Sequence, residues 1–304
     1  MRDPFLLEPE PGHFVLYGTT DENLWGGPAT GFDAFTSDDL EDWNGPIPVF
    51  RPPAGFWSDT QFWAPEVHPY RGRYFMFATF GSSDMQHRMR GTAVLVADSP
   101  LGPFLPWSDG PVTPHELPCL DGTFFVDDGG QPWIVYSRGA EGWYGQVGAA
   151  DSEMFARRLS DDLREGVGEP VVLFHSSDAS WSKPLWFPEG VEPPEQLGLA
   201  KDPLFTDGAF IVRAPGGALH MLWSAFGDDG YAMGVATSPS GSVLGPWQQR
   251  AEPLWPSNGG HGMILRTAAG PTYLTLHYPN DTPNERLALL EVAITEAGID
   301  RRNS

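Results

Sequence analysis

The sequence predicts an all-β fold, a five-bladed β-propeller that forms a single domain over residues 1–304. Two observations carry this prediction: short β-rich runs recur five times, and helical periodicity is almost absent. Turns rich in Gly and Pro separate the runs, and the chain has 36 Gly and 31 Pro. Repeats of roughly 50 to 85 residues, each with room for four strands, are typical of a propeller with long loops.

Each repeat begins with a predicted hairpin, whose first strand starts at a polar residue followed by a small residue or Pro. Turns such as Asp127-Asp128-Gly129-Gly130 suit such hairpins. The hairpins are expected at 3–17, 64–77, 121–136, 207–223 and 261–276. A turn that contains Ser follows the first four hairpins, and the fifth repeat lacks it. A β-sandwich is the alternative fold, but it does not explain the repeated polar start.

Composition restricts the class of partner. The formal charge is −22, which disfavours nucleic acid and anionic lipid and favours a neutral or cationic ligand. No apolar run approaches the roughly 18 residues that a membrane span needs. Cys119 is the single cysteine, so the chain cannot form an internal disulfide. The sequence starts without an apolar signal segment, and we therefore expect a cytoplasmic protein without nucleic-acid or membrane partners.

The polar residues at the hairpin starts are the candidate site. In a propeller the first strand of each blade lines the central channel, so equivalent positions face one another. Several carboxylates there raise each other's pKa, which is typical of functional sites. A single Asp before Gly or Pro usually only forms a turn, but three in register favour catalysis. The proposed equivalents are Asp3, Glu66 (or Trp63), Asp121, Asp207 and His261.

Inverting glycoside hydrolysis uses such an arrangement. One carboxylate acts as a base on water, and a protonated carboxyl group acts as an acid on the leaving oxygen. The two carboxyl groups lie roughly 6.5–9.5 Å apart. A third carboxylate can raise the pKa of the acid. Twelve Trp residues fit sugar stacking, although a single Trp is more often part of a core. We expect a sugar contact from Trp57, besides Trp63 and Glu66.

The ordered motifs resemble the inverting glycoside hydrolases of family 43 over essentially the whole chain. Arg2-Asp3-Pro4-Phe5 is similar to the opening motif that carries the base, and Trp63-Ala64-Pro65-Glu66-Val67 to the motif whose Trp lines the −1 sugar subsite. Leu120-Asp121-Gly122 is similar to the segment with the pKa-modulating Asp. Gly260-His261-Gly262 is similar to the histidine motif at the channel floor, and Arg286 falls where the family has a sugar-binding arginine.

The resemblance departs from the family at the acid. The family usually has Glu before Gly and Pro, whereas here the motif is Asp207-Gly208-Ala209. Asp is shorter by one methylene, about 1.5 Å of reach. We keep Asp207 as the predicted acid, with Glu189 and Glu195 as substitutes in the long loop 175–202, which we expect near the substrate.

The resemblance implies an exo-acting α-L-arabinofuranosidase or β-xylosidase on plant-type oligosaccharides, with galactofuranoside cleavage as another specificity. It implies no essential cofactor, and a calcium or sodium ion near His261 is expected in the channel. A sugar-binding propeller without acid catalysis is the non-enzymatic alternative. A phosphorylase would need a basic cluster that the 18 Lys and Arg do not form at the repeated positions. Because Asp3 is so near the start, we expect the first strand to pair with the last blade.

Overall fold

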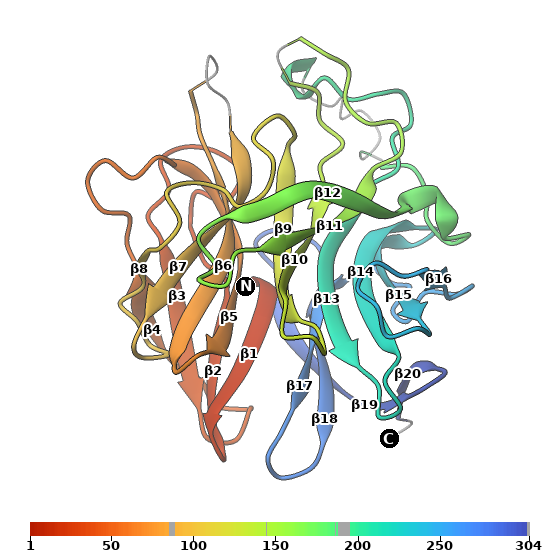
Figure 1. The fold of residues 1–304 in the computed structure, drawn as a ribbon. Helices are drawn as coiled ribbons and strands as arrows, with labels where there is room; N and C mark the ends of the chain where they lie inside the picture. Colours follow the sequence, from red (N-terminus) through yellow and green to blue (C-terminus); the bar gives the residue numbers. More distant parts are fainter. Residues whose placement is uncertain (85–88, 144, 186, 188–194, 303–304) are drawn as a thin grey trace.

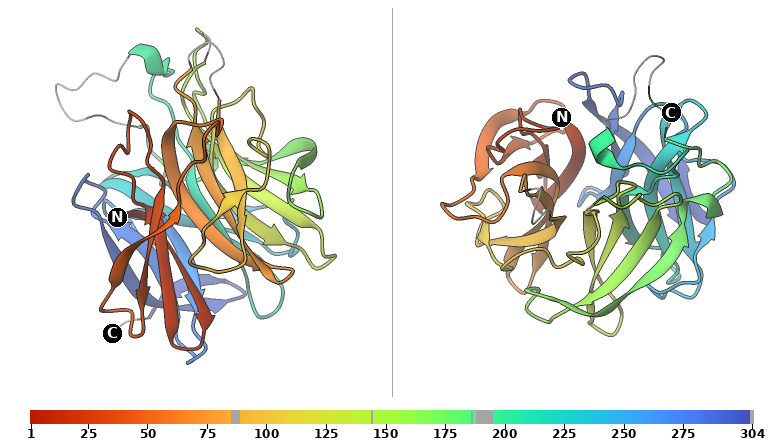
Figure 2. Two further views of the ribbon diagram at one scale, coloured as in Figure 1. Left: turned by 90° about the vertical axis from the view of Figure 1, so that its left-hand side faces the viewer. Right: turned by 90° about the horizontal axis from the view of Figure 1, so that it is seen from above.

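The computed structural model contains five four-stranded antiparallel sheets arranged around a central axis (Figures 1 and 2). The structure describes residues 1–84, 89–143, 145–185, 187 and 195–302. These residues contain no α-helix, and their short 3-10 turns are η1 (Ser176–Asp178) and η2 (Glu195–Leu197). No helix in this part of the chain is long and apolar enough to cross a membrane. The predicted five-bladed propeller is confirmed.

Each blade is built from four consecutive strands, in the order of the sequence. Blade one has β1 (Arg2–Glu10), β2 (His13–Thr19), β3 (Phe32–Ser37) and β4 (Asn44–Phe50). Blade two has β5 (Thr60–Tyr70), β6 (Arg73–Gly81), β7 (Arg90–Ala97) and β8 (Leu105–Pro106). Blade three has β9 (Cys119–Val126), β10 (Pro132–Arg138), β11 (Glu153–Leu159) and β12 (Gly166–His175). Blade four has β13 (Asp207–Arg213), β14 (Leu219–Gly227), β15 (Gly230–Ser238) and β16 (Gln248–Gln249). Blade five has β17 (Gly260–Arg266), β18 (Thr272–Tyr278), β19 (Arg286–Thr295) and β20 (Gly298–Arg301).

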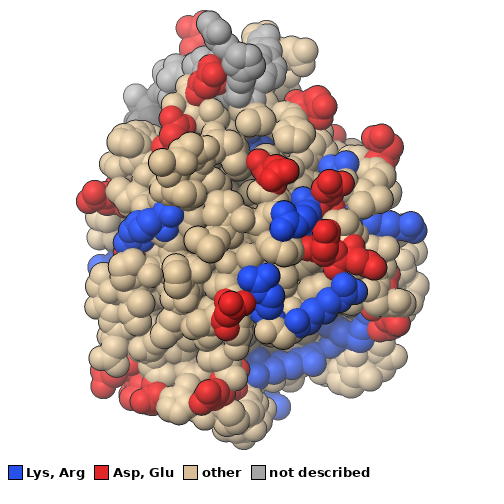
Figure 3. All heavy atoms as spheres, turned by 60° about the vertical axis from the view of Figure 1, so that its left-hand side comes forward, with Lys and Arg blue, Asp and Glu red and all other residues tan. Residues whose placement is uncertain are grey.

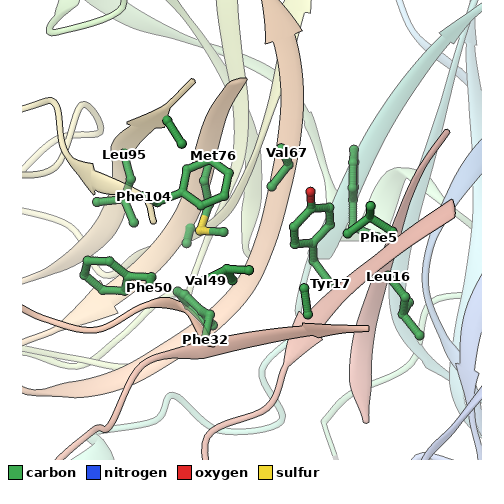
Figure 4. Close-up of a cluster of buried hydrophobic side chains, with 14 of the residues drawn as sticks. Phe5, Leu16, Tyr17, Phe32, Val49, Phe50, Val67, Met76, Leu95 and Phe104 are labelled. Carbon is green, nitrogen blue, oxygen red and sulfur yellow. The ribbon is translucent and has the colours of Figure 1, made fainter. Parts of the chain in front are cut away.

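The hydrophobic core lies between neighbouring blades. Because each sheet is covered on both faces, central strands such as β7 and β15 are buried along nearly their whole length instead of alternating. Figure 4 shows the cluster between blades one and two, where Phe5 and Tyr17 of blade one lie near Val67 and Met76 of blade two. On the face drawn in Figure 3, acidic and basic side chains are scattered over a mainly neutral surface.

The ring is closed without strand exchange, which corrects the expected pairing of the first strand with the last blade. β1 pairs with β2 of its own blade, and β17 to β20 complete blade five by themselves. Contacts of the N-terminal amino group and of one side chain join blades one and five instead. The Met1 amino group donates to the Glu285 carbonyl oxygen at 2.8 Å, and the Arg2 guanidinium pairs with the Glu285 carboxylate at 2.7 Å.

The five first strands, β1, β5, β9, β13 and β17, contact one another around the axis and share one irregularity. Near the start of each, the register with the second strand shifts at a bulge. A residue with positive φ, between 46° and 54°, lies at each bulge. Bulges change the direction of side chains. These five positions are equivalent around the axis, because each lies at the same bulge with the same backbone conformation. They are Asp3, Ala64, Asp121, Gly208 and His261.

Candidate active site

Three of the five bulge residues bring their side chains together on the propeller axis. The Nδ1 atom of His261 lies 3.2 Å from Oδ1 of Asp3 and 3.6 Å from Oδ2 of Asp121. Asp and His adopt positive φ more readily than most residues, and backbone strain of this kind clusters at functional sites. His261 is therefore level with the carboxylates, not below them at the channel floor as expected.

Asp207 reaches the same cluster from a different register. The residue with positive φ in blade four is Gly208, so Asp207 is equivalent to Trp63 rather than to Asp3. The imidazole of His261 explains the glycine, because a Cβ atom on Gly208 would lie 2.8 Å from its Cγ atom. The acidic group of blade four therefore comes from one residue earlier. A carboxylate oxygen of Asp207, a carboxylate oxygen of Asp121 and a ring nitrogen of His261 all lie within 4.8 Å of one another.

Side chains on the second strands hold the bulges of the next blade. Thr19 accepts a hydrogen bond from the amide of Ala64 at 2.8 Å, and the same hydroxyl donates to Oδ2 of Asp3 at 2.6 Å. The remaining contacts repeat this pattern around the ring: Asp121 N to Thr79 Oγ1 at 2.7 Å, His261 N to Ser224 Oγ at 2.9 Å, and Asp3 N to His277 Nδ1 at 3.3 Å. Four of the five bulges are thus held by a side chain of the preceding blade, which satisfies a buried backbone donor in each.

A stacked pair that the sequence analysis missed lies between Asp3 and Asp207. The Tyr231 hydroxyl donates to Oδ2 of Asp207 at 2.6 Å. The Tyr231 ring stacks on His277 at 5.5 Å and 12°, and His277 accepts the amide hydrogen of Asp3. His277 occupies the position that Thr19, Thr79 and Ser224 hold in other blades. This repeated position is the signal that could have identified His277.

Electrostatics keep Asp3 ionised. Burial raises the pKa of the Asp3 carboxyl, but the charges of His261, Arg2 and His277 and the hydroxyl of Thr19 outweigh it and lower the pKa to about 2. Asp3 is thus a carboxylate at any ordinary pH. An ionised carboxylate is the form that can accept a proton from water.

The opposite holds for Asp207. Burial raises the pKa of its carboxyl well above the usual value, and the neighbouring charge of Asp121 raises it further, against the opposing effects of His261 and Tyr231. Burial also raises the pKa of Asp121. Two carboxyl groups whose environments separate their pKa values indicate one base and one acid. The cluster can therefore hold Asp3 ionised and Asp207 protonated together.

Aromatic rings fill the channel beneath the cluster. Phe5 of blade one and Phe210 of blade four meet across the axis at 6.3 Å, and His68 lies 5.1 Å from Phe5. Glu66 belongs to this lower level, where its carboxylate lies 2.9 Å from Nε2 of His68. The predicted equivalence of Glu66 with Asp3 is therefore wrong, since Ala64 holds that position; its sugar-binding role stays a prediction. Among the described residues, these rings occupy the space below the carboxylates, so we expect a substrate to approach from the opposite end.

The two predicted sugar-binding tryptophans differ in their surroundings. Trp63 is half-buried, donates from Nε1 to the Leu24 carbonyl oxygen at 2.7 Å, and has the Arg90 guanidinium 5.6 Å from its ring centre. Trp57 contacts the rings of Phe56 and Phe80 in the core between blades one and two. The contacts of Trp57 are thus those of a core residue, and its role toward sugar stays a prediction.

Of the remaining predicted residues that the structure describes, neither Arg286 nor Glu195 makes a hydrogen bond or ion pair with the cluster. Arg286 is exposed, and its guanidinium donates to the main-chain oxygens of Pro283 and Glu285, so its sugar-binding role is also untested. Glu195 is exposed on η2, and Glu189 lies outside the described residues. Among the carboxylates that the structure describes, Asp207 remains the acid that the geometry favours.

The described residues fit a proton-transfer site better than a directly bound metal. Calcium takes six to eight oxygen ligands, whereas Asp121, Asp207 and His261 offer three donor atoms, and Nδ1 of His261 is already within reach of Asp3. A cation held by Asp207 would also keep that carboxyl group ionised. The expected calcium or sodium ion near His261 stays a prediction.

A buried base and a buried acid that face one active site are what an inverting glycoside hydrolase requires. The chain matches the model for glycosyl hydrolases family 43 over residues 1–299. It therefore belongs to this family, whose members are inverting glycoside hydrolases, and the predicted resemblance is confirmed.

Solved structures support this assignment. An endo-arabinase from Bacteroides thetaiotaomicron VPI-5482 is 36% identical with a TM-score of 0.82, and the match covers 97% of this chain and 95% of that one. A thermostable family-43 glycoside hydrolase is 22% identical with a TM-score of 0.78, over 100% and 93% of the two chains. An α-L-arabinofuranosidase from Lactobacillus brevis is 16% identical with a TM-score of 0.70, over 100% and 93%. The last two show the fold alone. A comparison with curated proteins finds no significant match.

Proposed function

We propose that the protein is an exo-acting glycoside hydrolase that releases single pentose units, α-L-arabinofuranosyl or β-xylosyl, from neutral plant-type oligosaccharides. The opposed protonation states of Asp3 and Asp207 within one buried cluster carry this proposal. The three residues are nearly inaccessible, with Asp3 8%, Asp121 7% and Asp207 8% exposed, and aromatic rings lie below them. A site so enclosed favours one terminal sugar ring over the middle of a chain.

In the proposed mechanism the Asp3 carboxylate removes a proton from a water molecule, whose oxygen attacks the anomeric carbon. The bond from this carbon to the leaving oxygen breaks on the opposite face of the ring, and Asp207 donates its proton to that oxygen. The products are the free sugar with inverted configuration and the shortened oligosaccharide. The proton returns from Asp3 to Asp207 through solvent. The expected separation of roughly 6.5–9.5 Å between acid and base stays a prediction for this pair.

The remaining groups orient the pair. Asp121 raises the pKa of Asp207 by its charge, Tyr231 holds Oδ2 of Asp207, and Thr19 and His261 hold the Asp3 carboxylate. The choice of sugar is supported by one similar protein: an endo-arabinase at 36% identity favours arabinose before xylose, whereas the exo action proposed here rests on the burial of the carboxylates. The galactofuranosidase and the sugar-binding alternatives of the sequence analysis remain as outcomes of the test.

The first experiment is a screen of nitrophenyl glycosides of arabinofuranose, xylopyranose and galactofuranose, with the anomer of the product followed by NMR. We expect turnover of the arabinofuranoside or the xyloside, with the inverted anomer formed first. Turnover of the galactofuranoside alone would overturn the pentose assignment. Binding of arabinose- or xylose-containing oligosaccharides without turnover of any glycoside would support a binding module instead.

Two variants then test the roles within the cluster. Asp3→Asn should lower kcat about 10²–10⁴-fold, the usual contribution of a general base, with little change in sugar affinity. Asp207→Asn should impair substrates with poor leaving groups far more than an activated aryl glycoside, whose leaving oxygen barely needs a proton. Equal losses on both kinds of substrate for Asp207→Asn would contradict the acid assignment and redirect attention to Glu189 and Glu195.

A further inference from the structure

A cavity of about 670 Å³ lies at the end of the propeller where β9 begins, the same end as the catalytic cluster. Its walls come from the segment that leads into β9 and from the loop that follows β10. Pro118 lines the cavity, and Asp121 follows it by only three residues, about 10 Å of extended chain. The cavity and the carboxylates are therefore neighbours on one face of blade three.

One ion pair links the cavity lining to the residues beside the cluster. Glu141 lines the cavity, and its two carboxylate oxygens accept hydrogen bonds from Arg90 at 2.7 and 2.8 Å. Arg90 is only 3% exposed, its guanidinium lies 5.6 Å from the Trp63 ring centre, and its charge lowers the pKa of Asp121 against the effect of burial. Arg90 thus contacts the cavity wall on one side and the proposed sugar site on the other.

The lining has the mixed chemistry that a sugar ring requires. Leu117, Pro118 and Val147 provide apolar surface for the carbon face of the ring, while Glu116, Arg138 and Glu141 provide acceptors and donors for hydroxyl groups. A volume of about 670 Å³ is within the usual range for small-molecule pockets. It has room for one or two sugar rings.

The described residues of the loop on one side of the cavity are tied to the chain at residues 197–198. Main-chain hydrogen bonds join Gly142 N to the Leu197 oxygen at 2.9 Å and Gly148 N to the Gly198 oxygen at 2.8 Å. A Cβ atom would lie 1.9 Å from a backbone oxygen at both Gly142 and Gly148, so the chain can cross here only because both are glycine. A preformed pocket binds with less loss of conformational entropy than one that must be ordered.

We infer that this cavity is a second sugar-binding site, which takes a further sugar unit of the same neutral oligosaccharide whose terminal unit occupies the catalytic cluster. This inference rests on the proposed function. It makes the enzyme selective for di- and longer saccharides over simple glycosides, because part of the binding energy comes from a sugar unit beyond the bond that is cleaved.

The test places a large side chain over the cavity. Val147 lines it and is 73% exposed, so Val147→Trp should fold normally and fill its mouth. The matched control is Val167→Trp on the outer strand β12, where the valine is 47% exposed and lies outside the cavity lining. Both variants are assayed on the aryl glycoside selected by the screen and on arabinobiose and arabinotriose, or on the xylose equivalents if xylose is selected.

We expect Val147→Trp to lower kcat/KM at least tenfold on the oligosaccharides and to change it less than twofold on the aryl glycoside, with Val167→Trp unchanged on both. Equal effects on the two kinds of substrate, or no effect on either, would overturn the second site. A wild-type protein that cleaves neither kind of substrate would instead contradict the proposed function, so the two failures are distinguishable.

The same inference predicts binding without catalysis. In the Asp3→Asn background, titration calorimetry should show tighter binding of the disaccharide than of the monosaccharide, and adding Val147→Trp should remove most of this difference. A disaccharide that binds no more tightly than its monosaccharide would contradict the inference independently of any activity assay.

Discussion

At the scale of single residues, the site depends on the charge of Asp121 next to Asp207. The acid must be protonated to act, so activity is lost as the pH rises through the pKa of Asp207. Burial raises this pKa, and Asp121 raises it further. Asp121→Asn removes the charge and should move the basic limb of the pH dependence of kcat/KM to lower pH, on an oligosaccharide whose leaving group needs a proton. The acidic limb, set by Asp3 with a pKa of about 2, should stay below the assay range. An unchanged basic limb would argue against this coupling.

Tyr231 should act on the acid without touching the substrate. Its hydroxyl favours the ionised form of Asp207, so Tyr231→Phe should raise the pKa of Asp207 and move the basic limb to higher pH, opposite to Asp121→Asn. Loss of orientation should also lower kcat about tenfold on poor leaving groups. Tyr136→Phe is the control, because the Tyr136 hydroxyl is buried but has no hydrogen-bond partner among the described residues. A downward shift of the basic limb in Tyr231→Phe would contradict the assigned role.

The sequence was enough to predict that Asp3, Asp121, Asp207 and His261 meet on the axis, but not how they do so, and it misplaced Glu66. Asp3, Asp121 and His261 occupy equivalent bulge positions, and the repeat made this visible. Asp207 is offset by one residue, because His261 fills the space of a side chain at Gly208. Such an exclusion depends on a contact between blades, which no local pattern encodes. Tyr231 escaped notice for the same reason, since its partners come from other strands.

At the scale of elements, the bulge at the start of β13 is what places the acid. Gly208→Ala would put a methyl group 2.8 Å from Cγ of His261. Positive φ in an L-residue costs about 1–2 kcal/mol by itself, yet Ala64 tolerates φ 46° at the equivalent position of blade two. We therefore expect Gly208→Ala to lower both thermal stability and kcat, the latter through displacement of His261 and Asp207.

A matched variant separates the two effects of that methyl group. Gly12 also has positive φ, 78°, but no atom of the described residues lies within 4 Å of the place that a Cβ atom would take there. Gly12→Ala should lower the melting temperature through φ alone and leave kcat of the folded enzyme unchanged. If Gly208→Ala lost stability but kept full kcat, the contact with His261 would not be what positions the site.

The elements themselves were predictable to different degrees. Hairpins with alternating or continuous apolar runs stand out in the sequence, and the five predicted ones match the first two strands of each blade. Short outer strands such as β8 and β16 have two residues each and carry no periodic signal. The bulges also leave no signal in the sequence, because a one-residue shift of register leaves composition unchanged.

At the scale of the whole molecule, repetition predicted the number of blades but not how the ring closes. A repeat states that five similar units exist, and a strand contributed by the N-terminus to the last blade would give almost the same pattern. The structure closes the ring through the contacts of Met1 and Arg2 with Glu285 instead. Asp3 is the next residue, so the contacts that close the ring also position the proposed base.

This closure can be tested through the Arg2–Glu285 pair. The Glu285 side chain is 3% exposed, and removing its partner by Arg2→Ala should destabilise the protein by about 3 kcal/mol, as for other buried pairs that lose one member. The control is Arg302→Ala, which removes an equally short pair with Glu291 whose side chains are 61% and 42% exposed. An exposed pair contributes about 0–1 kcal/mol, so the control should unfold at nearly the wild-type denaturant concentration.

The pH dependence of this difference has a defined sign. Burial raises the pKa of Glu285, but Thr282 and Arg2 outweigh it, so the folded-state pKa lies below the ordinary value of 4.5. A carboxyl group with a depressed pKa stabilises the fold above its unfolded-state pKa and loses this contribution as the pH falls through the folded-state pKa. The stability gap between wild type and Arg2→Ala, measured by denaturant unfolding, should therefore be largest near neutral pH and shrink below about pH 4.5. A gap that widened on acidification would mean that Arg2 stabilises the ring by some means other than its charge.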